Sequence, residues 1–316
     1  MSNRAALARF LRLYGMLLVL IILIAALGIL QPRALNPTNI LNLARQISIT
    51  ALVSAGQTLV ILAAQIDLSV GSVVGLAGVI AAGVLRDSGS ALLAVSAGLG
   101  VGAACGWVNG VIVAKGRVAA FIVTLATLGI ANGITLIYTG ARPIAVENDA
   151  FAFLGEGKID GIPFPIILAA LVYVLLWVVL NKTPFGRYNY AIGGNELATR
   201  LAGIPVDRYK IYIFVSAGIL AGLTGIVLTA RLGSGVPTLG SGFELISITA
   251  VVLGGTSLFG GEGKIWGTLV GAAITGIIAN ALSILGVGAY YQPVVTGVVI
   301  VLAVLADRWL RVSSRR

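Results

Sequence analysis

Long apolar segments alternate with short polar loops along almost the whole chain of 316 residues. A segment of about 18 or more apolar residues is long enough to cross a bilayer as a helix. We therefore predict an all-α polytopic membrane protein, a single domain over residues 1–316 with about ten transmembrane helices (range eight to eleven). The predicted spans are residues 13–30, 47–64, a third that ends near 85, then 91–114, 118–138, 163–180, 211–230, 242–259, 265–285 and 291–306.

The amino-acid composition supports a location in the membrane. Hydrophobic residues make up 58% of the chain and charged residues only 10%, whereas soluble domains carry about 25% charged residues. The formal net charge is +10, but the basic residues sit in short loops beside apolar spans. This placement indicates an orienting role in the membrane rather than binding of nucleic acid.

The distribution of charge also predicts an orientation. Most of the 21 Lys and Arg residues fall on the side that holds both chain ends and the loop 181–210. By the positive-inside rule, we expect the N and C termini and this loop in the cytoplasm. The longest loop on the other side, residues 139–162, is net acidic, and we expect it on the periplasmic or extracellular face.

The basic loop 181–210 contains sequence signals for a short helix. Asn195 can cap it, because its side-chain oxygen can accept from the first free backbone N–H groups. Glu196 places a negative charge at the positive end of the helix dipole, and Gly203 marks the stop. The sequence therefore predicts a helix of about two turns in a cytoplasmic loop.

Two leucines give this short helix an apolar face. Leu197 and Leu201 lie four residues apart on one face, and Glu196 can pair with Arg200 on a neighbouring face. The helix belongs to no membrane span that could bury the leucines. Either it lies on the lipid surface, or it docks onto a soluble partner.

Several polar side chains fall within or beside the predicted spans. A charge at the bilayer centre costs roughly 2.5–3.5 kcal/mol, so it must be buried in protein or in water. Asp67, in the turn before the third span, is interpreted as a cap that accepts from the N–H of Ser69 or Val70. The neutral residues suit hydrogen bonds between helices or contacts to a polyhydroxylated solute. The polar candidates for a pathway or a structural role are Gln57, Gln65, Asp67, Asn109, Asn132 and Asn280.

Glycines recur every four residues along the predicted span 91–114. Gly98, Gly102, Gly106 and Gly110 therefore share one helix stripe, which lets a neighbouring backbone approach closely. An internal duplication is also suggested, because ISITA occurs at 47–51 and again at 246–250. Repeated halves are common among transporters.

Missing residue types narrow the chemistry. The chain has no histidine and a single cysteine, Cys105, so it lacks the usual general base and can form neither an internal disulfide nor a cysteine-based metal site. The glycine-rich run ending at Lys264 has Leu258 and Ile265 where a phosphate-binding loop needs Gly and Ser or Thr. We expect no cofactor, no metal site and no ATP hydrolysis by this chain.

Several stretches match a known family in the expected order. They are IDLSVGS, GVIVAKGRVAAF, FGRYNYAIGGNELATRLAGIPVDRYKI, AVVLGGTSLFGGEGKIWGTLVGA and LGVGAYYQPVVTGVVIVLAVLADR. Together they resemble the membrane permease subunit of bacterial ABC sugar importers, closest to the ribose-type permeases. The resemblance runs over nearly the whole chain. Two departures are Gln65, where the family usually has Gly, and Gln57, where it usually has Met.

The resemblance implies a set of partners in the bacterial cytoplasmic membrane. A second permease chain, most simply an identical one, would form the pathway together with this chain. A cytoplasmic ATPase would drive transport, and a soluble sugar-binding protein outside would deliver the solute. The helix formed by Asn195, Glu196, Leu197, Arg200, Leu201 and Gly203 aligns with the family's coupling segment for the ATPase.

Two other functional classes remain open from the residues themselves. A stand-alone secondary transporter would need an ion-coupling site, for which Asp67 and Glu244 are the only acids to offer. A lipid-modifying membrane enzyme would need catalytic groups that the chain scarcely has. The two unusual amides, Gln57 and Gln65, could alter the preferred solute.

Overall fold

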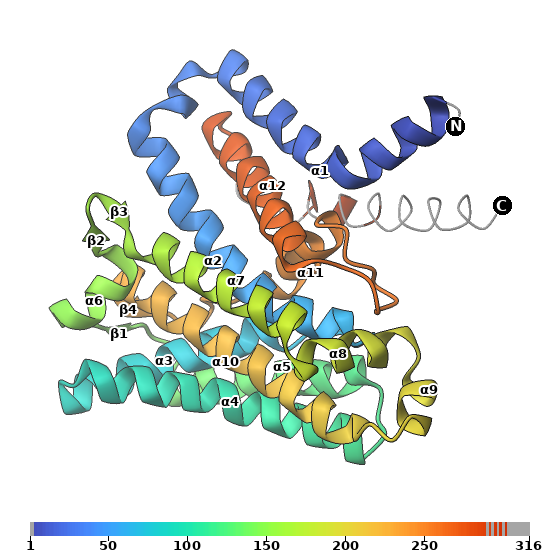
Figure 1. Cartoon of the computed structure of the whole chain (residues 1–316). Coiled ribbons are helices and arrows are strands. Elements are labelled where there is room, and N and C mark those ends of the chain that lie inside the picture. The colour runs from blue at the N-terminus through green and yellow to red at the C-terminus, as the bar shows by residue number, and fades with distance from the viewer. Residues whose placement is uncertain (1–2, 289–290, 292–293, 296, 299–300, 302–316) are drawn as a thin grey trace.

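The computed structural model describes residues 3–288, 291, 294–295, 297–298 and 301, and it is built almost entirely of helices (Figure 1). Two small antiparallel ribbons join helical segments: β1 (Ile144–Ala145) pairs with β4 (Ser234–Gly235), and β2 (Lys158–Ile159) with β3 (Ile162–Pro163). The helices are α1 (Asn3–Leu30), η1 (Pro32–Leu35), α2 (Pro37–Leu62), α3 (Val70–Ser88), α4 (Ala91–Lys115), α5 (Ala120–Thr139), α6 (Asp149–Glu156), α7 (Phe164–Lys182), α8 (Pro184–Gly194), α9 (Glu196–Leu201), α10 (Val206–Leu232), α11 (Phe243–Leu253) and α12 (Ile265–Ile284).

Seven helices within the described residues are long and apolar enough to cross a membrane. They are α2, α3, α4, α5, α7, α10 and α12. Two shorter apolar helical stretches, Met16–Ile29 in α1 and Phe243–Leu253, accompany them. The chain is therefore an all-α polytopic membrane protein, as predicted. The predicted span 291–306 lies largely outside the described residues.

Three sequence-based boundaries differ from the structure. Helix α2 begins at Pro37, ten residues before the predicted span 47–64, because Asn36 caps its start and Pro37 fits the first turn. Loop 181–210 holds two helices, since the unpredicted α8 precedes α9. The expected unbroken span 242–259 is wrong: α11 ends at Leu253, because Gly254 and Gly255 follow it and Gly255 has a φ of +82°.

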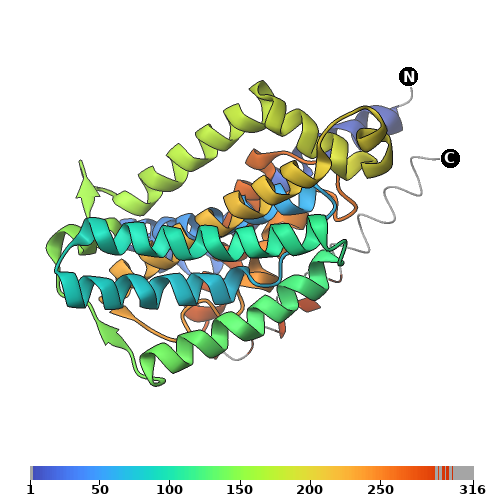
Figure 2. The ribbon, with the colours of Figure 1, turned by 90° about the horizontal axis from the view of Figure 1, so that it is seen from below.

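The bundle has two distinct ends. One carries β1, β4, α6 and the β2–β3 ribbon, and the other carries α8 and α9 (Figures 1 and 2). We call them the α6 end and the α9 end. Helix α6 is anchored by Phe151, which is fully buried among α3, α4 and α10. The acidic loop 139–162 thus forms a folded cap on the α6 end.

The closest helix pair is α4 with α10, where glycines meet backbone. A side chain at Gly102 would collide with the carbonyl of Gly218, and one at Gly106 with the carbonyl of Phe214. Gly110 of α4 lies against Ile211 of α10, and Gly98 of α4 lies against Ile226 of α10. The stripe of glycines thus lies at the α4–α10 contact, the kind of close packing that its spacing predicts.

Between α10 and α11 the chain enters the bundle from the α6 end. It has no helical structure over about the first half of the bundle's depth. Gly235 lies against Val79 and Ala82 of α3, and Gly240 lies against Gly71 at the start of that helix. Residues 234–242 therefore run antiparallel along α3, and we call them the extended segment. Helix α11, about 16 Å long, then continues towards the α9 end. A crossing made of an extended half and a helical half is a broken span, of the kind that transporters use near their pathways.

Candidate functional site

The short helix α9 lies at the α9 end and exposes two leucines. Asn195 Oδ1 accepts from the N–H of Ala198 at 2.9 Å, which caps the helix as the sequence predicts. Gly203 has a φ of +80° and lets the chain turn away. Leu197 and Leu201 are 67% and 80% exposed, so the structure leaves this apolar face open.

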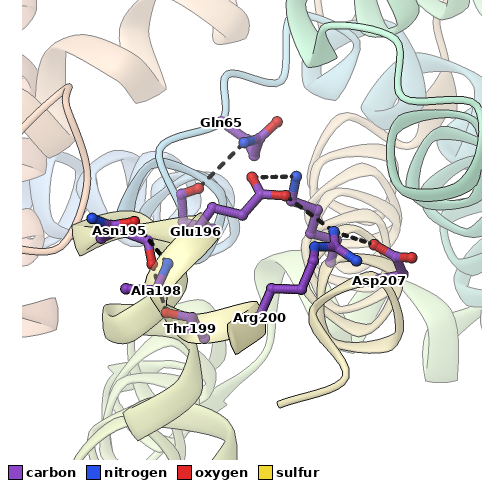
Figure 3. A network of polar contacts seen from close by, with 9 residues as sticks. Gln65, Asn195, Glu196, Ala198, Thr199, Arg200 and Asp207 are labelled. Atoms are coloured by element: carbon purple, nitrogen blue, oxygen red, sulfur yellow. Dashed lines mark hydrogen bonds and ion pairs between the residues drawn. The ribbon is translucent and has the colours of Figure 1, made fainter. Parts of the chain in front are cut away.

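Four charged side chains fix α9 on the start of α10 (Figure 3). Glu196 accepts from Lys210 at 2.7 Å and from Arg200 at 3.3 Å, and Arg200 also binds Asp207 at 2.7 Å. The side chain of Lys210 is only 9% exposed. The hydrogen bond to Asp207 raises the pKa of the Arg200 guanidinium further above its ordinary value. We call these four residues the ion network.

Sequence reasoning found only one of the three ion pairs. The pair between Glu196 and Arg200 follows from their i,i+4 spacing. Asp207 and Lys210 come from α10, beyond the turn at Gly203, and only the fold brings them back to α9. The only feature of the sequence that pointed to these two residues was the high density of charged residues in loop 181–210.

Helix α8 connects α9 to the interior of the bundle. The buried side chain of Asn189 donates to the carbonyl of Leu59 in α2 at 3.0 Å. Tyr190 donates to the carbonyl of Gly263, just before α12, at 3.0 Å. Gly193 packs directly on the carbonyl of Leu62. Helix α8 therefore connects α9 to α2 and to the loop before α12, a link that the sequence did not reveal.

A cleft of about 740 Å³ opens beside α9. Its polar lining includes Gln65 from the α2–α3 turn, Arg117 from the α4–α5 turn, and Glu196, Arg200 and Lys210 from the ion network. Gln65 donates to the carbonyl of Ala63 at 3.3 Å. This candidate pathway residue thus lies at the α9 end of the bundle.

Asp67 is buried in the turn before α3 and bound by Ser69. One carboxylate oxygen accepts from the Ser69 N–H at 2.8 Å and from its hydroxyl at 2.6 Å. Asn109 of α4 donates to the same hydroxyl at 3.0 Å, and Thr127 of α5 donates to Asn109 at 2.5 Å. The structure therefore brings Asp67 and Asn109 into one network that ties the turn to α4 and α5.

The remaining polar candidates lie apart from this network. Asn280 of α12 exchanges hydrogen bonds of 3.4 Å with Asn39 of α2. Asn132 is exposed on α5. Gln57 is 1% exposed, and neither atom of its amide has a hydrogen-bond partner among the described residues. The six candidates therefore do not form a single site.

The sequence of residues 39–304 matches the family model described as the permease component of the branched-chain amino acid transport system. The chain belongs to this permease family. It is 46% identical over 313 residues to the ribose import permease of Haemophilus influenzae, covering 98% of this chain and 97% of that one. It is 49% identical over 295 residues to the ribose import permease of Escherichia coli K12, covering 92% of each.

A further relative is named for a different sugar. The L-arabinose transport system permease of Escherichia coli K12 is 41% identical over 302 residues, which cover 96% of this chain and 92% of that one. No solved structure matches the chain. As a member of the permease family, the chain is the multi-pass membrane component of an ABC importer in the bacterial inner membrane. ATP hydrolysis in such importers belongs to a separate ATPase subunit, and a binding protein is the other partner that membership implies.

Proposed function

We propose that this permease is the membrane subunit of an ATP-driven importer for a monosaccharide, with ribose or a related pentose as its solute. The relatives that support this proposal cover nearly the whole chain, and the two named for ribose are more similar than the one named for arabinose. The described helices supply a polytopic scaffold for transport.

The observation that carries the mechanism is the exposed leucine pair on a firmly fixed helix. Leu197 and Leu201 offer an apolar face of two side chains outside the bundle, and the ion network holds their helix on α10. An amphipathic helix that presents an exposed apolar face is a common docking element for a protein partner. We propose that this face docks onto the ATPase, and that α8 passes its movement to α2 and α12.

The same proposal orients the protein. The α9 end faces the cytoplasm, where the ATPase is found, and the positive-inside rule predicts both chain termini on the same side. Loop 139–162, with its folded α6 cap, faces the binding protein on the other side. A second copy of the chain completes the pathway, and the ATPase biases the two conformations only as far as it binds them differently.

The test is co-purification from native membranes in mild detergent. Leu197→Asp should lose the ATPase subunit that the unchanged chain retains, because a carboxylate would replace the apolar anchor. The matched control is Leu232→Asp, since Leu232 is also an exposed leucine, 53% exposed, but lies at the α6 end of α10. Retention of the ATPase by Leu197→Asp, or its loss in both variants, would contradict docking through α9.

The secondary-transporter hypothesis predicts a different outcome of the same experiment. The chain would purify without an ATPase, and uptake would survive depletion of ATP but collapse with the proton gradient. Of the two acids it could use, Asp67 is already bound by Ser69. Family membership favours the ATP-driven reading.

A further inference from the structure

Two helices begin at the same point inside the bundle. Helix α3 starts at Val70 and runs towards the α6 end, and α11 starts at Phe243 and runs towards the α9 end. Gly71, in the first turn of α3, touches both the carbonyl of Gly240 and the carboxylate of Glu244. We call this meeting point the α3–α11 junction. Each helix directs the positive end of its dipole at it.

The junction lies inside the bundle, six residues inside the end of α4, so a membrane that α4 crosses would enclose it. Ser69 is bonded to Asn109, which is six residues, about 9 Å, from the end of α4 at Lys115. The 11 residues of α11 separate the junction from the loop at the α9 end. The extended segment, which follows α3 for most of its length, separates it from the α6 end.

The extended segment cannot face lipid. Irregular backbone at membrane depth leaves N–H and C=O groups that hydrocarbon cannot satisfy, so it occurs only against protein or water. Thr238 and Ser241 are exposed, and Glu244 is partly exposed beside them. A carboxylate at this depth also needs water or a polar partner. Among the described residues, the Glu244 carboxylate accepts a hydrogen bond from the N–H of Gly242 at 3.2 Å.

A buried amide lies on the inner side of the same junction. One turn before Gln57 in α2, Val53 packs with Val70, Val73 and Val74 of α3. One turn after it, Ile61 packs with Ile248 and Val251 of α11. Gln57 therefore faces the boundary between the two helices. Its amide is fully buried and has no hydrogen-bond partner among the described residues, a state that costs free energy unless another ligand or conformation supplies partners.

We propose that the α3–α11 junction is a contact site for the polyhydroxylated solute, with Glu244 as the residue that recognises it. The carboxylate accepts hydrogen bonds from sugar hydroxyl groups at the water-filled face. A shift of α11 away from α3 then exposes the Gln57 amide, which can both donate to and accept from a hydroxyl. The sugar part of this inference rests on the proposed function, whereas the water-filled face does not.

Thiol labelling tests the water-filled face without any solute. In a Cys105→Ser background, Thr238→Cys and Ser241→Cys should react with a charged, membrane-impermeant thiosulfonate in purified, lipid-reconstituted complex. Leu171→Cys is the control, because Leu171 is 62% exposed on the apolar helix α7. Absence of labelling at both segment positions, or equal labelling of all three, would overturn the proposal.

Uptake kinetics test the recognition. Vesicles holding the permease, its ATPase and binding protein would be assayed with D-ribose. Glu244→Gln should raise the KM for uptake about 10-fold, while ATPase stimulation by the binding protein stays within twofold. Asp87→Asn, at the exposed end of α3 and outside loop 139–162, should match the unchanged chain. An unchanged KM in Glu244→Gln would overturn the role of Glu244.

A third readout covers variants that assemble poorly and separates the two proposals. Glu244→Asp moves the carboxylate by one methylene, and it should change the order in which D-ribose, L-arabinose and D-allose compete for uptake. An unchanged order would overturn recognition at the junction. Failure of the unchanged chain to transport any of these sugars would instead defeat the proposed function, with the labelling result still standing.

Discussion

The region around α9 and the α3–α11 junction differ in which side chains lack a partner: apolar side chains at α9, and a polar side chain at the junction. At α9 the charges are paired, since Glu196 has two cationic partners, while Leu197 and Leu201 are left exposed. At the junction the apolar residues Ile61 and Val251 are buried, while the Gln57 amide has no partner among the described residues. An exposed apolar face is completed by a protein. An unpartnered polar group is completed by water, a solute or a second conformation.

The α4–α10 contact forms a frame that joins the two regions, because α10 carries Asp207 and Lys210 of the ion network and α4 carries Asn109, which is bonded to Ser69 beside the junction. Gly102→Leu tests that frame, and we expect the largest effect here, because the new side chain would collide with the backbone of Gly218. Overpacking costs typically 1–3 kcal/mol or more, so the Tm of the detergent-purified protein should fall by about 5 °C or more.

The control for this variant lies two residues away. Gly100 is on the same helix, and a side chain there meets nothing within 4 Å. Gly100→Leu should therefore leave the Tm unchanged. Equal losses in both variants would point to a general intolerance of leucine in α4 rather than to the close contact.

A second change addresses the paired charges at α9. Glu196→Gln removes the carboxylate that binds the nearly buried Lys210, and it should loosen α9 by about 1–2 kcal/mol, since removing one partner leaves a buried cation without compensation. Trypsin cleavage after Arg200 would then rise about 10-fold, which reports local opening of the helix.

Asp207→Asn provides the matched comparison for Glu196→Gln. Asp207 binds Arg200, and both side chains are more than 40% exposed, so this pair is worth less than 1 kcal/mol or so. Cleavage should rise by less than about threefold. If Asp207→Asn opened α9 as much as Glu196→Gln does, the buried end of the network would not be its anchor.

A third change, at the junction, is expected to have a small effect of the opposite sign. Gln57→Met replaces an unpartnered buried amide with an apolar side chain of similar length, and it should stabilise the protein by about 1 kcal/mol. A rise in Tm of a few degrees would register this. Gln46→Met, at an exposed position of α2, should leave the Tm unchanged. A fall in Tm for Gln57→Met would mean that the amide is satisfied after all.

Sequence patterns predicted the parts of this structure that depend on neighbours along the chain. The Asn195 cap, the stop at Gly203 and the pairing of Glu196 with Arg200 all act within two helical turns. The bond from Ser69 to Asp67 is equally local. The glycine stripe gave the packing face of α4, although not its partner α10.

What the sequence did not predict depends on residues far apart. The end of α11 at Leu253 was missed, because the apolar run continues past it and hydropathy alone does not register the two glycines that follow. Helix α8 was missed because its burial comes from α2 and from the loop before α12. Gln57 was recognised as unusual, but only the fold shows that its amide is enclosed. The internal duplication stays a prediction, with its two ISITA copies in α2 and α11.

The β1–β4 ribbon has a mechanical consequence for the α6 end. Ile144 pairs with Gly235, and Ala145 with Ser234, so the chain leaving α5 is stitched to the start of the extended segment. The chain after α5 and the start of the extended segment are therefore held together at the α6 end. At the α9 end, α5 and α11 lead into separate loops. We expect these two helices to move apart more easily there. We therefore expect a small displacement at the α6 end to open a larger gap at the α9 end, with the ribbon as the pivot.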